Sequence, residues 1–122
     1  MLFRSLVPVI VFVTSAAMAF ATGTSWGTMA ILLPVVIPLT VALGGADVLP
    51  GGAGFPIFLG ATASVLAGAI FGDHCSPISD TTIISSMAAA TDHIDHVRTQ
   101  LPYALTGGAI AAVLFAVLGA TL

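Results

Sequence analysis

A short polar stretch between two apolar segments constrains the fold of this chain more than any other feature. Residues 72–82 read Gly-Asp-His-Cys-Ser-Pro-Ile-Ser-Asp-Thr-Thr and contain two carboxylates, a histidine, four hydroxyls and a proline. Apolar segments flank this stretch over residues 55–71 and 83–90. An ionisable side chain deep in hydrocarbon costs about 2.5–3.5 kcal/mol on insertion scales, so such a stretch marks an ion or substrate path. The polar stretch is therefore the candidate site.

The scarcity of charge indicates that the chain lies in a lipid bilayer. Only 6 % of its 122 residues are charged and 58 % are hydrophobic, whereas soluble domains carry roughly 25 % charged residues. The basic residues are two arginines and no lysine, so no basic face exists for nucleic acid. Each membrane crossing needs about 20 residues. The chain is short for a complete transporter, and we expect one part of a larger assembly.

A second polar stretch, residues 22–28, separates the apolar segments 5–21 and 29–43. Non-helical backbone at membrane depth must be buried in protein or line a water-filled cavity, so one interpretation is the tip of a re-entrant helical hairpin. The other is an extramembrane turn in which Trp26 anchors the chain at the interface. Residues 5–21 also resemble a secretory signal peptide, but its cleavage would separate them from the polar stretch.

The apolar segments on either side of the candidate site predict one discontinuous crossing. As helices, residues 55–71 would span roughly 25 Å and residues 83–90 roughly 12 Å. Neither length suits a hydrocarbon core about 30 Å thick, so we expect one broken helix over residues 55–90. Pro77 cannot continue a regular helix, and it disfavours helical backbone at Ser76.

The C-terminal segment, residues 101–122, predicts a continuous crossing. Pro102 would lie in its first turn, where the missing N–H is harmless. Residues 91–100 are polar, and we expect a solvated loop there. The alternative is a metal site formed by His93, His96 and the neighbouring aspartates.

The candidate site offers oxygen ligands and groups that exchange protons. Hydroxyl and carbonyl oxygens suit a small hard cation such as Na⁺, by analogy with Ca²⁺ and Mg²⁺. A carboxylate can exchange a proton for such a cation, which makes Asp73 and Asp80 the candidate proton carriers, and His74 can relay the proton. The residues expected to bind the ion are Thr22, Thr24, Ser25, Asp73, Ser76, Ser79, Asp80, Thr81 and Thr82.

Other chemistries are poorly supported by the sequence. The chain lacks the H-E-x-x-H and G-x-S-x-G motifs, and a phosphate loop with a lysine is impossible because no lysine exists. Three consecutive residues, Asp73-His74-Cys75, rarely converge on one transition metal. We therefore expect no enzyme, no transition metal and no cofactor, with Na⁺ and H⁺ only as transported ions.

Three segments resemble the NhaC family of sodium/proton antiporters. They are residues 21–28 with the proline-containing segment after them, residues 71–82, and residues 92–103. The family belongs to a wider group of ion transporters built from inverted repeats. In that group each half carries a re-entrant hairpin followed by an unwound helix, and the two breaks form the ion site.

The resemblance implies an all-α, multi-pass protein of the cell membrane, with residues 1–122 as one membrane domain within a larger inverted-repeat transporter. It implies a hairpin over 6–43 with its tip at 22–28, a broken helix over 55–90 with its break at 72–82, and a final helix over 101–122. The loop before the final helix would face the cytoplasm. Family members are several times longer, so the lipid bilayer and a missing N-terminal half are the expected partners, together with a second copy of the chain.

Three functions remain open. The first is the C-terminal portion of a secondary transporter that exchanges Na⁺ for H⁺ between two unwound polar segments. The second is a sodium-coupled exchanger of small carboxylates or amino acids, since half-helix N-termini can hold an anionic group. The third is a membrane fragment that transports nothing without a partner half.

Overall fold

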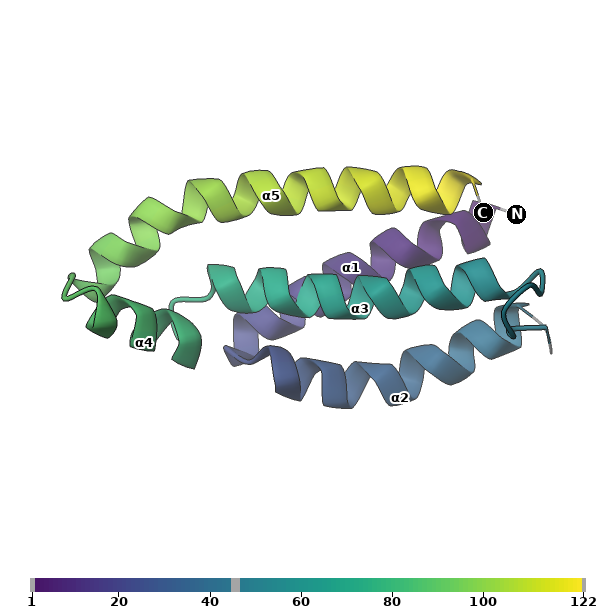
Figure 1. Ribbon diagram of the computed structural model, residues 1–122, viewed down its shortest axis with the longest axis horizontal. Coiled ribbons are helices and arrows are strands. Elements are labelled where there is room, and N and C mark those ends of the chain that lie inside the picture. The colour runs from purple at the N-terminus through teal and green to yellow at the C-terminus, as the bar shows by residue number, and fades with distance from the viewer. Residues whose placement is uncertain (1, 45–46, 122) are drawn as a thin grey trace.

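The computed structural model describes residues 2–44 and 47–121, and over these ranges it contains helices and no strands. The helices are α1 (Leu2–Thr22), α2 (Ser25–Gly44), α3 (Phe55–Cys75), α4 (Asp80–Ala88) and α5 (His93–Thr121) (Figure 1). Helices α1, α2, α3 and α5 are each long and apolar enough to cross a membrane. The prediction of an all-α fold with membrane-spanning helices is confirmed, while Leu122, the end of the predicted final helix, lies outside the described residues.

Helix α3 is the centre of the bundle. It contacts each of the other four helices, and in Figure 1 it lies between α2 and α5 with α1 crossing behind it. Buried Val7 and Val11 of α1, Val36 of α2 and Val65 of α3 belong to one hydrophobic cluster that joins the first three helices. The α1–α2 hairpin and α3 therefore share one core.

Helices α1 and α3 approach closely next to the candidate site. A Cβ atom at Gly72 would lie 2.1 Å from the carbonyl oxygen of Ala16, a distance that no side chain tolerates. Further along the same interface, the Ser15 hydroxyl donates a 2.7 Å hydrogen bond to the carbonyl oxygen of Val65. This contact fixes how α3 lies against α1 as both helices approach their C-terminal ends.

The start of α5 corrects the sequence prediction. The helix begins at His93, whereas a solvated loop was expected over residues 91–100 and a helix only from residue 101. The Asp92 carboxylate explains the earlier start, because its Oδ1 accepts hydrogen bonds from the Ile94 N–H at 2.9 Å and the Asp95 N–H at 3.2 Å. Pro102 consequently lies inside α5 rather than in its first turn, and the helix curves toward α4 at its N-terminal end (Figure 1).

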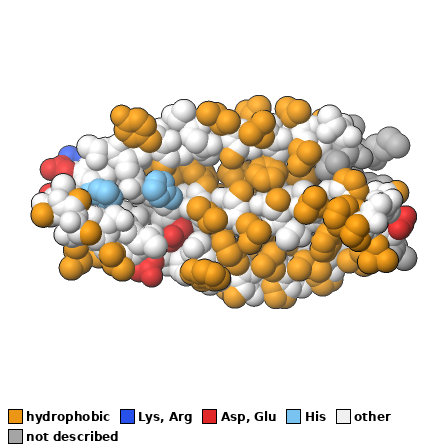
Figure 2. All heavy atoms as spheres, in the orientation of Figure 1, with side chains coloured by type: hydrophobic (Ala, Val, Ile, Leu, Met, Phe, Trp, Pro, Cys, Tyr) orange, Lys and Arg blue, Asp and Glu red, His pale blue; other side chains and the backbone are white. Residues whose placement is uncertain are grey.

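The surface is apolar along most of the molecule. Figure 2 shows hydrophobic side chains across the middle, with acidic, basic and histidine side chains at the end where α4 lies and an acidic group at the opposite end. Large side chains such as Ile31 and Val35 of α2 and Leu114 and Val117 of α5 are exposed. Monomers in water rarely expose apolar patches of this extent, so lipid or further protein covers these faces.

Candidate functional site

Two interruptions of the helical backbone lie side by side in the bundle. Gly23 and Thr24 separate α1 from α2, and residues 76–79 separate α3 from α4. A Cβ atom at Gly23 would lie 2.8 Å from the carbonyl oxygen of Ile78. The Ser76 hydroxyl also donates a 2.8 Å hydrogen bond to the carbonyl oxygen of Phe20. We call this region, residues 20–24 together with 73–81, the junction.

The non-helical part of the second interruption is narrower than the predicted break over 72–82. Helix α3 continues to Cys75, and α4 already begins at Asp80. In a continuous helix the Asp73 carbonyl would accept from the nitrogen of Pro77, which has no hydrogen; it accepts instead from the Ser76 N–H at 3.1 Å. Ser76 has extended backbone angles (φ −75°, ψ 127°), which confirms the effect expected of the following proline.

The first interruption is also shorter than the predicted tip over 22–28. Gly23 takes the left-handed conformation (φ +69°) that glycine adopts without steric cost. Thr24 then caps α2, because its hydroxyl oxygen accepts the Gly27 N–H at 3.3 Å. Thr28 donates its hydroxyl to the Thr24 carbonyl at 2.9 Å. The chain thus reverses direction over two residues, and the remaining polar residues belong to helices.

Asp73 is the centre of a compact hydrogen-bonded cluster at the junction. Its side chain is only 7 % exposed and Ser79 is fully buried. Ser79 Oγ lies 2.8 Å from Asp73 Oδ1, Thr81 Oγ1 lies 3.1 Å from Asp73 Oδ2, and the two hydroxyl oxygens lie 2.7 Å apart. These four oxygen atoms therefore form a closed ring of three hydrogen-bonding contacts.

The other predicted site residues lie outside this ring. Asp80 is exposed, and its Oδ1 accepts the Thr81 N–H at 2.8 Å at the start of α4. Thr22 is exposed and donates its hydroxyl back to the Met18 carbonyl of its own helix at 2.9 Å. His74 is exposed on the last turn of α3. Ser25 is half-buried in the first turn of α2, and Thr82 is buried in α4.

Two side chains of α5 contact the junction; His93 was expected only in the alternative metal site, and Gln100 in no site. His93 Nε2 lies 2.7 Å from the Pro77 carbonyl oxygen, and His93 Nδ1 lies 3.1 Å from the Ser86 hydroxyl. The Gln100 side-chain amide donates to the carbonyl oxygen of His74. His93 and Gln100 are seven residues apart, which places them on one helix face, but that signal appears only once the helix is known to begin at His93.

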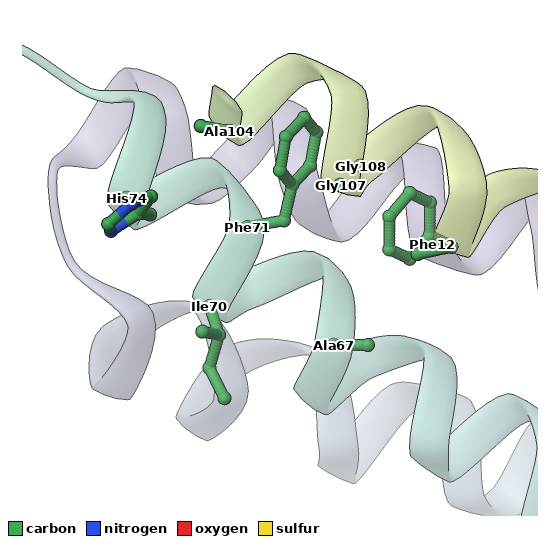
Figure 3. A pocket seen from close by; sticks show the side chains of 9 residues that line it. Phe12, Ala67, Ile70, Phe71, His74, Ala104, Gly107 and Gly108 are labelled. Atoms are coloured by element: carbon green, nitrogen blue, oxygen red, sulfur yellow. The ribbon is translucent and has the colours of Figure 1, made fainter. Parts of the chain in front are cut away.

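Apolar cavities flank the junction on the side of α5. One of about 250 Å³ lies between α1, α3 and α5, and Figure 3 shows the Phe71 ring pointing from α3 toward α5, where Gly108 leaves room for it. Phe71 stacks on Phe12 with ring centroids 5.8 Å apart. A second cavity of about 510 Å³ reaches Cys75 and is lined almost entirely by carbon. Such walls suit lipid or protein side chains rather than an ion.

No cluster of three His, Cys, Asp or Glu side chains suited to a metal ion occurs in the described ranges. The alternative metal site at residues 91–100 has no such set of ligands there, because the His93 ring contacts Pro77 and Ser86 instead. The oxygen ring around Asp73 is thus the strongest candidate for binding an ion.

Comparison with known proteins gives a family match over nearly the whole chain. A model of the Na⁺/H⁺ antiporter family matches residues 3–120. The chain is 40 % identical over 114 residues to the arginine/ornithine antiporter ArcD of Halobacterium salinarum, and 38 % over 102 residues to the malate-2H(+)/Na(+)-lactate antiporter of Bacillus subtilis. It is 31 % identical over 98 residues to the Na(+)/H(+) antiporter NhaC of Alkalihalophilus pseudofirmus.

These alignments cover most of this chain but little of the relatives. The alignment with ArcD covers 89 % of the chain and 21 % of the relative. The alignment with the malate-2H(+)/Na(+)-lactate antiporter covers 84 % and 19 %, and the alignment with NhaC covers 80 % and 19 %. The chain therefore spans about a fifth of the length of the curated relatives it matches. No solved structure matches the chain at a comparable level of significance.

Proposed function

Because the chain belongs to the Na⁺/H⁺ antiporter family, we propose that it contributes an ion site to a secondary transporter that exchanges Na⁺ for H⁺. The resemblance to NhaC antiporters is confirmed by the family match and by the relative of that name. The family and the four membrane-competent helices identify a multi-pass protein of the plasma membrane. The proposal concerns which atoms exchange the two ions.

The hydrogen bonding of Asp73 is the observation that carries this proposal. The ring formed with Ser79 and Thr81 has three oxygen–oxygen contacts, but the two hydroxyls supply only two protons. A third proton on the Asp73 carboxyl group completes the ring, with each oxygen contact receiving one proton. We propose that Asp73 carries this proton when no cation is bound.

Loss of this proton would leave a charge that the surroundings cannot neutralise. Both hydrogen-bond partners of Asp73 are neutral hydroxyls, and a buried carboxylate without a cation beside it is strongly disfavoured. A sodium ion bound by the carboxylate and the two hydroxyl oxygens would restore neutrality. Proton and sodium ion then compete for one carboxylate, which is the requirement for exchange. No cofactor is needed beyond the two transported ions.

The remaining predicted ligands take different parts in the proposal. Thr24 and Ser76 would bring further oxygens from the two facing interruptions, and Thr22, Ser25 and Thr82 would line the path. Asp80 is a weaker candidate proton carrier than Asp73, because it is exposed and its carboxylate already accepts the Thr81 N–H in the first turn of α4. Na⁺ coordination would be completed by the rest of the transporter, which we propose to be the N-terminal half of an inverted repeat.

The arrangement of helices supports the finer fold expected from the resemblance. We propose that α1 and α2 form a re-entrant hairpin and that α3 and α4 form one broken helix. The hairpin tip lies beside the α3–α4 interruption, well short of the N-terminal end of α5 (Figure 1). The 29 residues of α5 extend about 43 Å, more than a hydrocarbon core of about 30 Å. The tip would then lie within the membrane.

Exchange of organic substrates is the second candidate, favoured by the names of two relatives. The relatives called an arginine/ornithine antiporter and a malate-2H(+)/Na(+)-lactate antiporter are 40 % and 38 % identical to the chain, against 31 % for the relative called NhaC. In that case the N-termini of α2 and α4 would bind the carboxylate group of the substrate, and Na⁺ would act only as the coupling ion.

Transport in everted membrane vesicles tests the proposal, with the protein at its full natural length. Asn in place of Asp73 keeps the size and the hydrogen bonds of the side chain but cannot exchange a proton. We expect Asp73→Asn to reduce sodium-driven proton efflux by about a hundredfold or more, since such losses accompany removal of an essential proton-transfer group. Asp80→Asn is the matched control, with an expected change of about twofold or less because Asp80 lies exposed outside the oxygen ring and contributes only a negative charge in the first turn of α4.

Wild-type activity of Asp73→Asn would refute the role of this carboxylate. Vesicles loaded with labelled malate, lactate or arginine separate the two candidate functions. Sodium-dependent movement of one of these labels without sodium-driven proton efflux would favour the second candidate.

A further inference from the structure

The interruption between α3 and α4 leaves backbone carbonyls without their helical partners. In a continuous helix the Pro77 carbonyl would accept the N–H of Thr81, but that N–H donates to the Asp80 carboxylate at 2.8 Å. The His74 carbonyl would likewise accept the N–H of Ile78, which points to the Ser76 hydroxyl at 3.4 Å. The Pro77 carbonyl is partly buried, and burial without a donor costs a carbonyl about 1–3 kcal/mol, so it needs another partner. The His74 carbonyl lies at an exposed residue, where a partner is less strictly required.

Helix α5 supplies both partners from one face. His93 contacts the Pro77 carbonyl oxygen at 2.7 Å, and the Gln100 side-chain amide donates to the His74 carbonyl. The Pro77 carbonyl can only accept, so His93 Nε2 carries the hydrogen in this contact. The first two turns of α5 thus complete the hydrogen bonding that the interruption removed.

The other nitrogen of His93 fixes the orientation of the ring. His93 Nδ1 lies 3.1 Å from the Ser86 hydroxyl, whose oxygen is also 2.8 Å from the Ile83 carbonyl. Ser86 is buried in α4. One imidazole therefore connects the interruption, through Pro77, to the helix that follows it, through Ser86, and both connections originate from the first residue of α5.

We propose that His93 is a positioning residue that sets the geometry of the α3–α4 interruption and thereby of the ring at Asp73. Pro77 lies two residues before Ser79, whose hydroxyl contacts Asp73 at 2.8 Å. A displaced Pro77 carbonyl would shift Ser79 away from the carboxylate. His93 does not touch the ion. The consequence for transport rests on the proposed function, whereas the effect on the interruption does not.

Cys75 provides a built-in reporter of the interruption. It is the single cysteine of the chain, it is buried, and it is the last residue of α3. Labelling by N-ethylmaleimide in membranes measures how often the interruption opens to water. The amount of protein that reacts after denaturation in SDS provides the normalisation, so that loss of folded protein is not mistaken for lack of opening.

Three substitutions separate positioning from general packing. His93→Ala removes both hydrogen bonds, and we expect the labelling rate of Cys75 to rise by about tenfold, since opening frequency follows the lost local stability. His93→Gln keeps an amide donor for the Pro77 carbonyl and should stay within about twofold of wild type. His96→Ala is the matched control, because its Nε2 is buried without a hydrogen-bond partner in the described residues, and no change is expected.

The functional measurement is the apparent KM for Na⁺ in transport by the protein at its full natural length. His93→Ala should raise it by about tenfold, with His93→Gln restoring most of the loss, because misplaced ligands weaken sodium binding. Wild-type labelling of Cys75 in His93→Ala would overturn the positioning role while leaving the role of Asp73 intact. If His93→Ala labels faster than wild type but the wild-type protein shows no sodium-driven proton efflux, the positioning role is supported and the proposed function is refuted.

Discussion

The two interruptions at the junction are built in different ways. The one between α1 and α2 consists of Gly23 and Thr24, and its hydrogen bonds join residues at most four positions apart. The one between α3 and α4 depends on distant partners. Ser76 bonds to a residue 56 positions away, Pro77 to one 16 positions away and His74 to one 26 positions away.

This difference assigns the two interruptions different tasks. A turn stabilised by neighbouring residues keeps its shape whatever surrounds it, so the α1–α2 tip is the rigid side of the junction. The α3–α4 interruption keeps its shape only while α1 and α5 are in place, so it is the side that responds to rearrangement of the helices. The oxygen ring around Asp73 belongs to the responsive side. The following substitutions test this assignment.

The largest loss of stability is expected at the contact between the two interruptions. Gly23→Ala adds a Cβ atom 2.8 Å from the Ile78 carbonyl oxygen at a residue with φ +69°. We expect a loss of about 2–5 kcal/mol from the unfavourable backbone angle and the overpacking together. Thermal unfolding in detergent measures the change.

Gly51→Ala is the control for this prediction. Gly51 also has a positive φ of +94°, but a Cβ atom added there would meet nothing within 4 Å. The loss there should be limited to about 1–2 kcal/mol of backbone strain. Equal losses at the two glycines would mean that the contact between the interruptions contributes nothing.

An intermediate effect is expected where the responsive side contacts α1. Ser76→Ala removes the hydroxyl that donates to the Phe20 carbonyl, and we expect a loss of about 1–3 kcal/mol because that carbonyl loses its donor. Ser85→Ala, at an exposed serine of α4, is the control and should change stability by about 0.5 kcal/mol or less. If the two variants unfold at the same temperature, the contact with α1 does not stabilise the α3–α4 interruption.

The smallest effect is expected on the rigid side. Thr24→Ala removes the cap of α2, and a loss of about 1 kcal/mol is expected because one N–H of the first turn loses its acceptor. Thr14→Ala, in an exposed part of α1, is the control. Because the cap is local, we also expect the labelling of Cys75 to stay unchanged in Thr24→Ala. Faster labelling there would show that the two interruptions are not independent.

The features that arise from neighbouring residues could be predicted from the sequence. Apolar segments of sufficient length predicted the helices, and Pro77 predicted the extended backbone of Ser76. The polar stretch also contained the three members of the oxygen ring, Asp73, Ser79 and Thr81. Their selection from a larger set of predicted ligands required the structure, because a stretch of eleven residues does not reveal which hydroxyls face the carboxylate.

The features that arise from packing could not be predicted. The start of α5 depends on the Asp92 cap, but a polar segment of this composition is equally typical of a loop. The contacts of His93 with Pro77 and Ser86 join three elements whose relative positions are not encoded in any local pattern. The approach of Gly23 to Ile78 likewise depends on how the hairpin lies against α3.

Four helix ends converge where the two interruptions touch, and this has an electrostatic consequence. α1 and α3 end there, while α2 and α4 begin there. Each terminus carries about half an elementary charge, negative at a C-terminus and positive at an N-terminus, so the four contributions nearly cancel. The backbone field neither traps a cation nor repels one. Under the proposed function, control over cation occupancy would then be left to the Asp73 carboxyl group.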